Sequence, residues 1–154
     1  MDHPVLNHKF ASHSHAPTVL YLHGFLGCGD DWSEIVNRLG SGLSHLTVDL
    51  PGHRMSANDL PSEYYCMSGC AELIVSLLKH LRIERCHLVA YSMGGRLALY
   101  LLTQYPDRFL SAVMESASPG LKTEAERTAR RQQDQLWIKR LRERSIDEFL
   151  KEWY

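Results

Sequence analysis

Residues 88–96 read Leu-Val-Ala-Tyr-Ser-Met-Gly-Gly-Arg, and this stretch decides the fold. An apolar run that predicts a buried strand ends abruptly at Ser92, and the residues two positions to either side, Ala90 and Gly94, are small. This spacing is typical of a nucleophile elbow, a tight turn from a strand into a helix whose crowded backbone leaves little room for neighbouring side chains. Such a turn lifts the serine hydroxyl clear of the sheet, so Ser92 is the candidate nucleophile.

Short apolar runs alternate with amphipathic stretches from residue 18 onward. The apolar runs predict strands over residues 18–23, 44–49, 86–91 and 109–115. The amphipathic stretches predict helices over residues 32–39, 71–81 and 96–104. This alternation is typical of an α/β fold with a parallel sheet and helices on both faces.

The composition changes after Pro119. From Pro119 to the end, 16 of 36 residues are charged, against 19 of the 118 before it, and no further strand is predicted. We predict helices over residues 124–144 and from residue 146 onward, with Ser145 as the N-cap of the second. The pattern fits either a helical lid or a pair of charged surface helices. The predicted organisation is an N-terminal tail or edge strand over 1–17, an incomplete core over 18–118 and a lid segment over 119–154.

The overall composition narrows the class of protein. With 154 residues, 44% of them hydrophobic, the chain is long enough for one buried core, and its formal net charge of −1 argues against nucleic acid as a partner. No apolar run approaches the roughly 20 residues that span a bilayer, and the N-terminus lacks the pattern of a signal peptide. We therefore expect a cytoplasmic protein with no membrane partner.

The cysteines and histidines show no metal-ligand spacing. The four cysteines are scattered, so we expect free thiols. His3, His8, His13 and His15 fall in a polar, serine-rich stretch before the first strong strand. We interpret that stretch as a solvated tail rather than a metal site.

Two loops are expected beside Ser92. An oxyanion needs preplaced donors, and we predict the backbone amides of Met93, directly after the serine, and of Phe25, in the loop 23–27. A third segment, residues 49–53, follows the next strand, where α/β sheets place their site loops. We interpret His23 and His53 in these segments as loop-shaping residues.

Arginines suggest an anionic ligand. Arg96 lies about one turn into the helix that follows Ser92, where the helix dipole disfavours a cation, so a compensating anion is expected. That anion is either a substrate carboxylate or a nearby acidic side chain. Arg127, Arg130 and Arg131 gather towards one face of the predicted lid helix and suit carboxylates, although each taken singly is also typical of a solvated surface.

The proton acceptor for Ser92 is missing from the sequence. A serine nucleophile on this fold needs an acid and then a histidine later in the chain, but no histidine follows His87. We therefore predict half of a catalytic site. Residues 109–115 would then form an uncovered apolar sheet edge, for which we predict self-association or poor solubility.

Taken together, these segments resemble the α/β-hydrolase fold and, more narrowly, the 2-succinyl-6-hydroxy-2,4-cyclohexadiene-1-carboxylate synthases of menaquinone (vitamin K2) biosynthesis. The resemblance runs over residues 18–154. It rests on Leu-His-Gly-Phe-Leu-Gly with Asp-Trp, on Val-Asp-Leu-Pro-Gly-His, on Tyr-Ser-Met-Gly-Gly-Arg, and on Pro-Gly-Leu-Lys-Thr-Glu-Ala-Glu-Arg leading to Trp-Tyr. The chain departs from the family pattern at Arg54-Met55, where a glycine usually follows Gly-His, and at Ser116-Ala117-Ser118, where Gly-Gly-His is frequent.

The resemblance implies a lyase that needs no metal or organic cofactor. In that family, a serine activated by histidine abstracts a proton and pyruvate leaves a small carboxylate substrate, 2-succinyl-5-enolpyruvyl-6-hydroxy-3-cyclohexene-1-carboxylate. Carried over by position, Ser92 would be the base and the amides of Phe25 and Met93 the oxyanion donors. The implied substrate contacts are Tyr91, Arg96, Arg130 and Trp153.

Two other functions remain open at the level of the sequence. The same fold serves hydrolases of carboxylic esters or carbon–carbon bonds. A catalytically inactive remnant that binds acidic metabolites or a partner protein would also carry these motifs.

Overall fold

The computed structural model describes residues 5–56 and 60–153. The chain divides into two compact units, Met1–Pro119 and Gly120–Tyr154. The first contains the sheet and the second contains two helices. In the described residues, no helix is long and apolar enough to cross a membrane.

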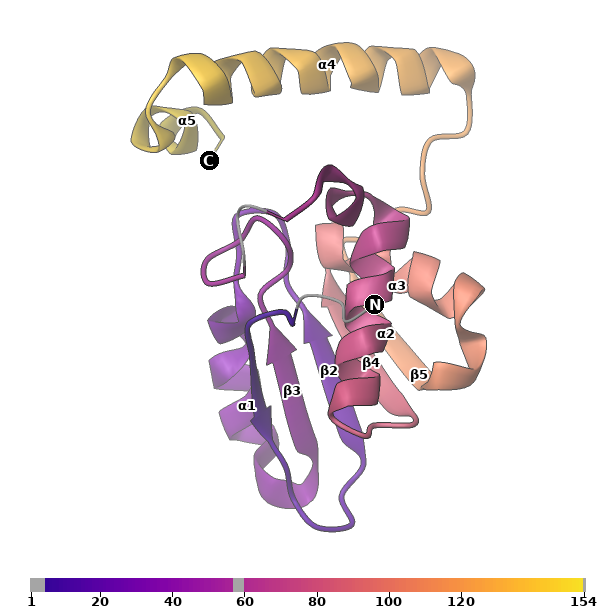
Figure 1. Ribbon diagram of the computed structural model, residues 1–154. Coiled ribbons are helices and arrows are strands. Elements are labelled where there is room, and N and C mark those ends of the chain that lie inside the picture. The colour runs from indigo at the N-terminus through magenta and orange to yellow at the C-terminus, as the bar shows by residue number, and fades with distance from the viewer. Residues whose placement is uncertain (1–4, 57–59, 154) are drawn as a thin grey trace. The chain divides into compact units, whose positions relative to one another are not determined.

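A five-stranded sheet in the order β1-β3-β2-β4-β5 forms the centre of the first unit (Figure 1). Its strands are β1 (His8–Ala11), β2 (Thr18–Leu22), β3 (Ser44–Val48), β4 (Cys86–Tyr91) and β5 (Phe109–Glu115). β2 to β5 pair in parallel, and β1 pairs antiparallel with β3. The four predicted strands are confirmed to within one residue at each end.

Of the two forms that the sequence left open for the N-terminal stretch, a solvated tail or an edge strand, residues 8–11 adopt the edge strand, β1. Residues 8–11 pair with β3 through the register His8↔Val48 to Ala11↔His45, so this stretch is the edge strand of the sheet. His13 is also held, because its N–H donates to the Ser44 hydroxyl over 2.9 Å. Polar, half-exposed side chains suit an edge strand, and the main-chain pairing that orders them leaves no hydrophobic signal in the sequence.

Helices cover both faces of the sheet, as predicted. On one face, Leu20, Leu46 and Leu88 from neighbouring strands form a core with residues of α2 (Met67–His80) and α3 (Met93–Gln104). The other face packs Val19 and Tyr21 against Trp32, next to α1 (Ser33–Leu39). Figure 1 shows α1 and α2 on opposite sides of the sheet.

α2 and α3 begin earlier than the sequence pattern indicates. α2 starts at Met67 rather than residue 71, and α3 starts at Met93, ahead of its apolar pattern from residue 96 but in agreement with the expectation that Arg96 lies one turn into the helix. The predicted starts followed apolar periodicity, which does not register glycines such as Gly69 or Gly94. Both glycines lie against other backbone, Gly69 against Glu63 and Gly94 against Leu22 and His23.

β5 is an edge strand of the described sheet. Most of its side chains are exposed, and Val113 retains 65% of its accessible surface. On the face that carries Val19 and Tyr21, Val113 is the register partner of Val89 on β4. The predicted apolar edge is therefore present, and self-association through it stays a prediction.

The second unit is a helical hairpin with capped ends. α4 (Glu124–Glu143) begins at Thr123, whose side chain accepts from the Glu126 N–H. α5 (Ile146–Trp153) begins after Ser145, whose hydroxyl accepts from the Glu148 N–H over 3.3 Å, as predicted for this cap. Trp137, Phe149 and Trp153 pack together with ring centroids 5.2–5.7 Å apart. These aromatic contacts join α4 to α5.

Candidate active site

Ser92 occupies a strained turn between β4 and α3. Its φ of 51° and ψ of −110° lie in a region that residues with side chains rarely adopt. The Ser92 N–H donates to the Glu115 carbonyl at the end of β5 over 2.9 Å, which fixes the turn from one side. Within residues 5–56 and 60–153, the hydroxyl of Ser92 has no hydrogen-bond partner and is available for chemistry.

Two glycines allow other backbone segments to approach the elbow. A Cβ added at Gly94 would lie 2.5 Å from the Leu22 carbonyl oxygen and 2.6 Å from that of His23, so α3 begins directly against the end of β2. A Cβ added at Gly24 would lie 2.9 Å from the Tyr91 ring and 3.4 Å from the Ser92 Cβ. The loop 23–27 therefore lies beside the serine, which is where the predicted Phe25 donor requires it to be.

Substituting Gly94 by alanine should destabilise the first unit by about 1–3 kcal/mol, because the new methyl group overlaps two backbone carbonyls that cannot rotate away. Urea denaturation followed by circular dichroism measures the change. Gly42→Ala is the matched control, since a Cβ there would meet no atom within 4 Å. Equal midpoints for the two variants would contradict the close packing inferred here.

Two histidines join the loop 23–27 to the segment 49–56. His23 Nδ1–H donates to the Gly24 carbonyl over 2.7 Å, and its Nε2 accepts from the Leu50 N–H over 3.0 Å. Burial lowers the pKa of His23, so this ring is neutral near pH 7. His53 Nε2 accepts from the Leu26 N–H over 3.3 Å. Both imidazoles shape the loops, as the sequence analysis expected.

Asp49 is a residue of the candidate site that the sequence analysis did not single out. Its carboxylate accepts from the Gly29 N–H at 2.8 Å, from the Asn7 amide at 2.7 Å and from the Met55 N–H at 3.3 Å. These three donors belong to three different segments around the site. The available signal was its position in Val-Asp-Leu-Pro-Gly-His, where an acidic residue directly follows a buried strand.

The net pKa shift of Asp49 is downward. Burial alone would raise the pKa, but the hydrogen bonds from Gly29, Asn7 and Met55, together with the Arg54 charge, outweigh burial. A carboxyl with a depressed folded pKa stabilises the fold fully above its unfolded pKa of about 3.9. That contribution is lost as the pH falls through the lower, folded value.

Replacing Asp49 by asparagine should cost about 1–3 kcal/mol at neutral pH, because an amide cannot accept from all three donors. The loss of stability on acidification should also become shallower than in the unmodified chain. Unfolding free energies measured by urea titration between neutral pH and about pH 3 test both effects. Asp107→Asn, at an exposed position, is the control; identical pH profiles for Asp49→Asn and the unmodified chain would refute the role of Asp49.

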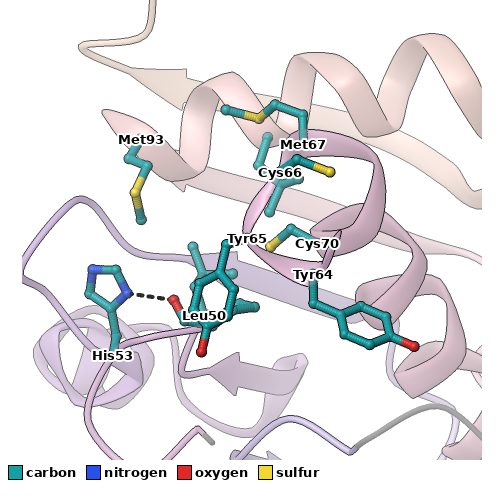
Figure 2. Close-up of a pocket in the computed structure, with 10 residues that line it drawn as sticks. Leu50, His53, Tyr64, Tyr65, Cys66, Met67, Cys70 and Met93 are labelled. Atoms are coloured by element: carbon teal, nitrogen blue, oxygen red, sulfur yellow. Dashed lines mark hydrogen bonds between the residues drawn. The ribbon is translucent and has the colours of Figure 1, made fainter. Parts of the chain in front are cut away.

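A pocket of about 90 Å³ opens between the segment 49–53 and the start of α2 (Figure 2). His53 and Met93 line it on one side, and the aromatic and sulfur-containing side chains Tyr64, Tyr65, Cys66, Met67 and Cys70 line the other. The Ser68 hydroxyl lowers the pKa of the exposed Cys66 thiol, whereas burial raises that of Cys70 to about 12. All four cysteines of the chain are free, as predicted. The pocket provides an apolar compartment next to the residue that follows Ser92.

Arg96 has no acidic partner in the described parts of the chain, residues 5–56 and 60–153. Its side chain is exposed, and its N–H donates to the Ser92 carbonyl in the first turn of α3. Of the two anions that the sequence left open, the acidic side chain is therefore not found. Tyr91, just before the serine, is also exposed. Their assignment as substrate contacts stays a prediction.

The arginines of α4 that were predicted to gather on one face are paired with acids of their own helix. Arg130 Nε donates to Asp134 over 2.7 Å, and Arg127 and Arg131 both pair with Glu124. Trp153 belongs to the aromatic cluster that joins α4 to α5. The substrate roles of Arg130 and Trp153 likewise stay predictions.

Both departures from the family motifs fall at left-handed backbone positions. Arg54 has a φ of 44° and Ser116 a φ of 53°, conformations in which glycine carries no steric penalty. Arg54 pairs with Asp30, which also pairs with Lys9 on β1. This ion-pair network holds Arg54 where a glycine would be unstrained.

No group of three or more His, Cys, Asp or Glu side chains within residues 5–56 and 60–153 is arranged as metal ligands would be. Besides the hydrogen-bonded Asp49 carboxylate and the tyrosines and cysteines of the pocket, the site holds backbone amides, the Ser92 hydroxyl, two imidazoles and the Arg96 guanidinium, which pairs with no acid in the described residues. Such a set can bind an anion and stabilise an oxyanion.

This combination of a mostly parallel sheet, a strained serine and an adjoining glycine-containing loop defines a class of protein. A family model described as the alpha/beta hydrolase fold matches residues 17–146, and the chain belongs to this family. The predicted fold class is thereby confirmed.

Within this family, the chain is similar to relatives that share one name. The chain is 36% identical over 147 residues to the 2-succinyl-6-hydroxy-2,4-cyclohexadiene-1-carboxylate synthase of Photorhabdus laumondii, covering 95% of this chain and 51% of the synthase. It is 35% identical to the synthase of the same name from Citrobacter koseri, over 90% of this chain and 54% of the relative. The structure of MenH from S. aureus superposes with a TM-score of 0.84 at 29% identity, over 95% of this chain and 55% of that one. The chain thus spans about half the length of the curated relatives it matches.

Proposed function

We propose that this chain carries the serine half of a menaquinone-pathway lyase that eliminates pyruvate from 2-succinyl-5-enolpyruvyl-6-hydroxy-3-cyclohexene-1-carboxylate. The observation that carries the proposal is the juxtaposition of Ser92, in a strained turn, with Arg96. In the described residues, the Ser92 hydroxyl has no hydrogen-bond partner and the Arg96 side chain has no acidic partner. The relatives named as 2-succinyl-6-hydroxy-2,4-cyclohexadiene-1-carboxylate synthases support the substrate class.

In the proposed reaction, Ser92 takes a proton from a ring carbon of the substrate. The electrons of the broken C–H bond form a ring double bond, and the bond from the ring to the enolpyruvyl oxygen breaks. The leaving enolate is protonated to pyruvate, so no oxidant or reductant is consumed. In this mechanism a histidine that follows the serine in the chain accepts the serine proton, and these 154 residues hold no histidine after His87.

The backbone supplies the electrostatic part of this mechanism. Met93 is the first residue of α3, where N–H groups have no partner within the helix and the dipole is positive. The Phe25 amide belongs to the loop that Gly24 allows against Ser92. In the proposed site, these two amides stabilise negative charge that develops on a substrate carboxylate or carbonyl oxygen.

Arg96 is proposed to bind one carboxylate of the substrate. A guanidinium offers two parallel donors that match a carboxylate. At the N-terminal end of α3, a bound anion also relieves the unfavourable interaction between the Arg96 charge and the helix dipole, about 0.3–1 kcal/mol. A neutral ester gains neither interaction, and this difference separates the lyase from an ester hydrolase of the same fold.

Pyruvate release tests the proposal. We expect activity when the chain is joined to the segment of the Photorhabdus laumondii relative that follows the matched region, with pyruvate measured by coupling to lactate dehydrogenase. In this fusion, Ser92→Ala should lower the rate by about 10³-fold or more, and Arg96→Ala should lower kcat/KM by about ten- to hundredfold. Arg38→Ala, an exposed arginine paired with Glu34, is the control and should have no effect.

Two results would contradict the lyase. Hydrolysis of neutral esters at a rate unchanged by Arg96→Ala, without pyruvate release, would identify an ester hydrolase. Binding of the carboxylate substrate without turnover in the fusion would identify a binding protein. Full turnover by the isolated 154-residue chain would refute the claim that its catalytic site is incomplete.

A further inference from the structure

His53 contacts the loop 23–27 at its most strained residue. Leu26 has a φ of 65°, in the left-handed region that residues with side chains seldom adopt. Its N–H donates to His53 Nε2 over 3.3 Å. Such conformations persist only where the surroundings hold them in place, and within the described residues this is the hydrogen bond that holds the Leu26 N–H.

The hydrogen bonds of His53 admit a single form of the ring. The Pro51 carbonyl lies 3.0 Å from Nδ1 and must be met by an N–H. Nε2 must therefore carry a lone pair to accept from Leu26, which makes His53 the neutral Nδ1–H tautomer. Ring packing adds to this anchor, since the His53 centroid lies 4.9 Å from that of His23 and 6.1 Å from that of Phe25, which it meets edge-on.

The anchor acts one residue away from the proposed oxyanion donor. The planar peptide between Phe25 and Leu26 turns as one body, so fixing the Leu26 N–H fixes the backbone on the C-terminal side of Phe25. On the N-terminal side, the Gly24 carbonyl accepts from both the His23 ring and the Gly27 N–H. The Phe25 N–H lies in the peptide of this Gly24 carbonyl, and the peptide that follows it is the one anchored by His53.

We propose that His53 is a positioning residue whose Nε2 holds the Phe25 amide in the direction that an oxyanion requires. The proposal rests on the proposed function only for the role of Phe25 as an oxyanion donor. The positioning itself is a property of the ligand-free chain.

Two substitutions separate the hydrogen bond from the ring packing. His53→Phe keeps an aromatic ring but has no acceptor, whereas His53→Gln can accept from Leu26 through its amide oxygen and donate to Pro51 through its amide nitrogen. We expect hydrogen exchange of the Leu26 amide, followed by NMR on the 154-residue chain, to become about tenfold faster in His53→Phe. In His53→Gln it should remain near the rate of the unmodified chain.

Reference amides and a control variant exclude a general loss of stability. The Leu81 N–H, bonded to Leu77 in α2, should exchange at the same rate in all variants. His87→Phe, which removes the hydrogen bond between His87 and Ser111, should leave Leu26 unchanged. Equal Leu26 exchange in His53→Phe and the unmodified chain would overturn the proposal, and so would equally fast exchange in His53→Gln and His53→Phe.

A measurement on the unmodified chain keeps the proposal testable if His53→Phe does not fold. ¹⁵N shifts of the His53 ring should show a protonated Nδ1 and an unprotonated Nε2 at neutral pH. A protonated Nε2 would overturn the proposal, because that nitrogen could not accept from Leu26. None of these measurements uses a substrate, so a failure of the proposed lyase activity would be recognised separately.

Discussion

The contact between Gly94 and the end of β2 is the constraint on which the site depends. Because a hydrogen replaces a side chain at Gly94, α3 starts directly beside the carbonyls of Leu22 and His23. This approach forces the chain to reverse at Ser92, where φ is positive and the N–H is tied to the Glu115 carbonyl. The backbone strain at Ser92 is therefore held by β2 on one side and β5 on the other, and the same turn exposes the hydroxyl. The contact of Gly94 with the end of β2 thus both packs α3 against the sheet and presents the Ser92 hydroxyl.

The loops around the serine are held by polar contacts in addition to packing. Asp49 collects donors from three segments, and His23 connects the loop after β2 with the segment after β3. Asp49 and His23 are buried, so an unsatisfied hydrogen-bonding group there would cost free energy of folding. This cost favours one arrangement of the loops over others. The apolar core beneath positions the strands, whereas this network sets the direction of individual amides. An oxyanion site needs correctly directed amides as well as correctly placed strands.

The sequence predicted the parts of the molecule that depend on local pattern. The strands over β2 to β5, the elbow at Ser92 and the cap at Ser145 followed from apolar runs, small residues and cap chemistry. For residues 1–17 the pattern left a tail and an edge strand open, because His8–Ala11 becomes a strand only through main-chain bonds to β3. The role of Asp49 was hidden for a similar reason, since its donors come from Asn7, Gly29 and Met55, which are far apart in sequence. Whether Arg96 meets an acidic side chain also depends on tertiary neighbours, and pattern alone left that question open.

The arginines of the two units differ in what a carboxylate ligand would have to displace. Arg130 already pairs with Asp134, and Arg127 and Arg131 share Glu124, so a ligand would compete with these acids. Exposed ion pairs of this kind contribute about 0–1 kcal/mol. Replacing the acid by a ligand carboxylate therefore costs little free energy, but it also adds little to the affinity for the ligand. Arg96 pairs with no acid in residues 5–56 and 60–153 and lies at the positive end of α3. An anion bound to Arg96 displaces no acidic side chain of the described residues, and it offsets the repulsion between the Arg96 charge and the helix dipole. Discrimination between charged and neutral substrates should therefore rest on the first unit, on the same turn of helix that positions Ser92.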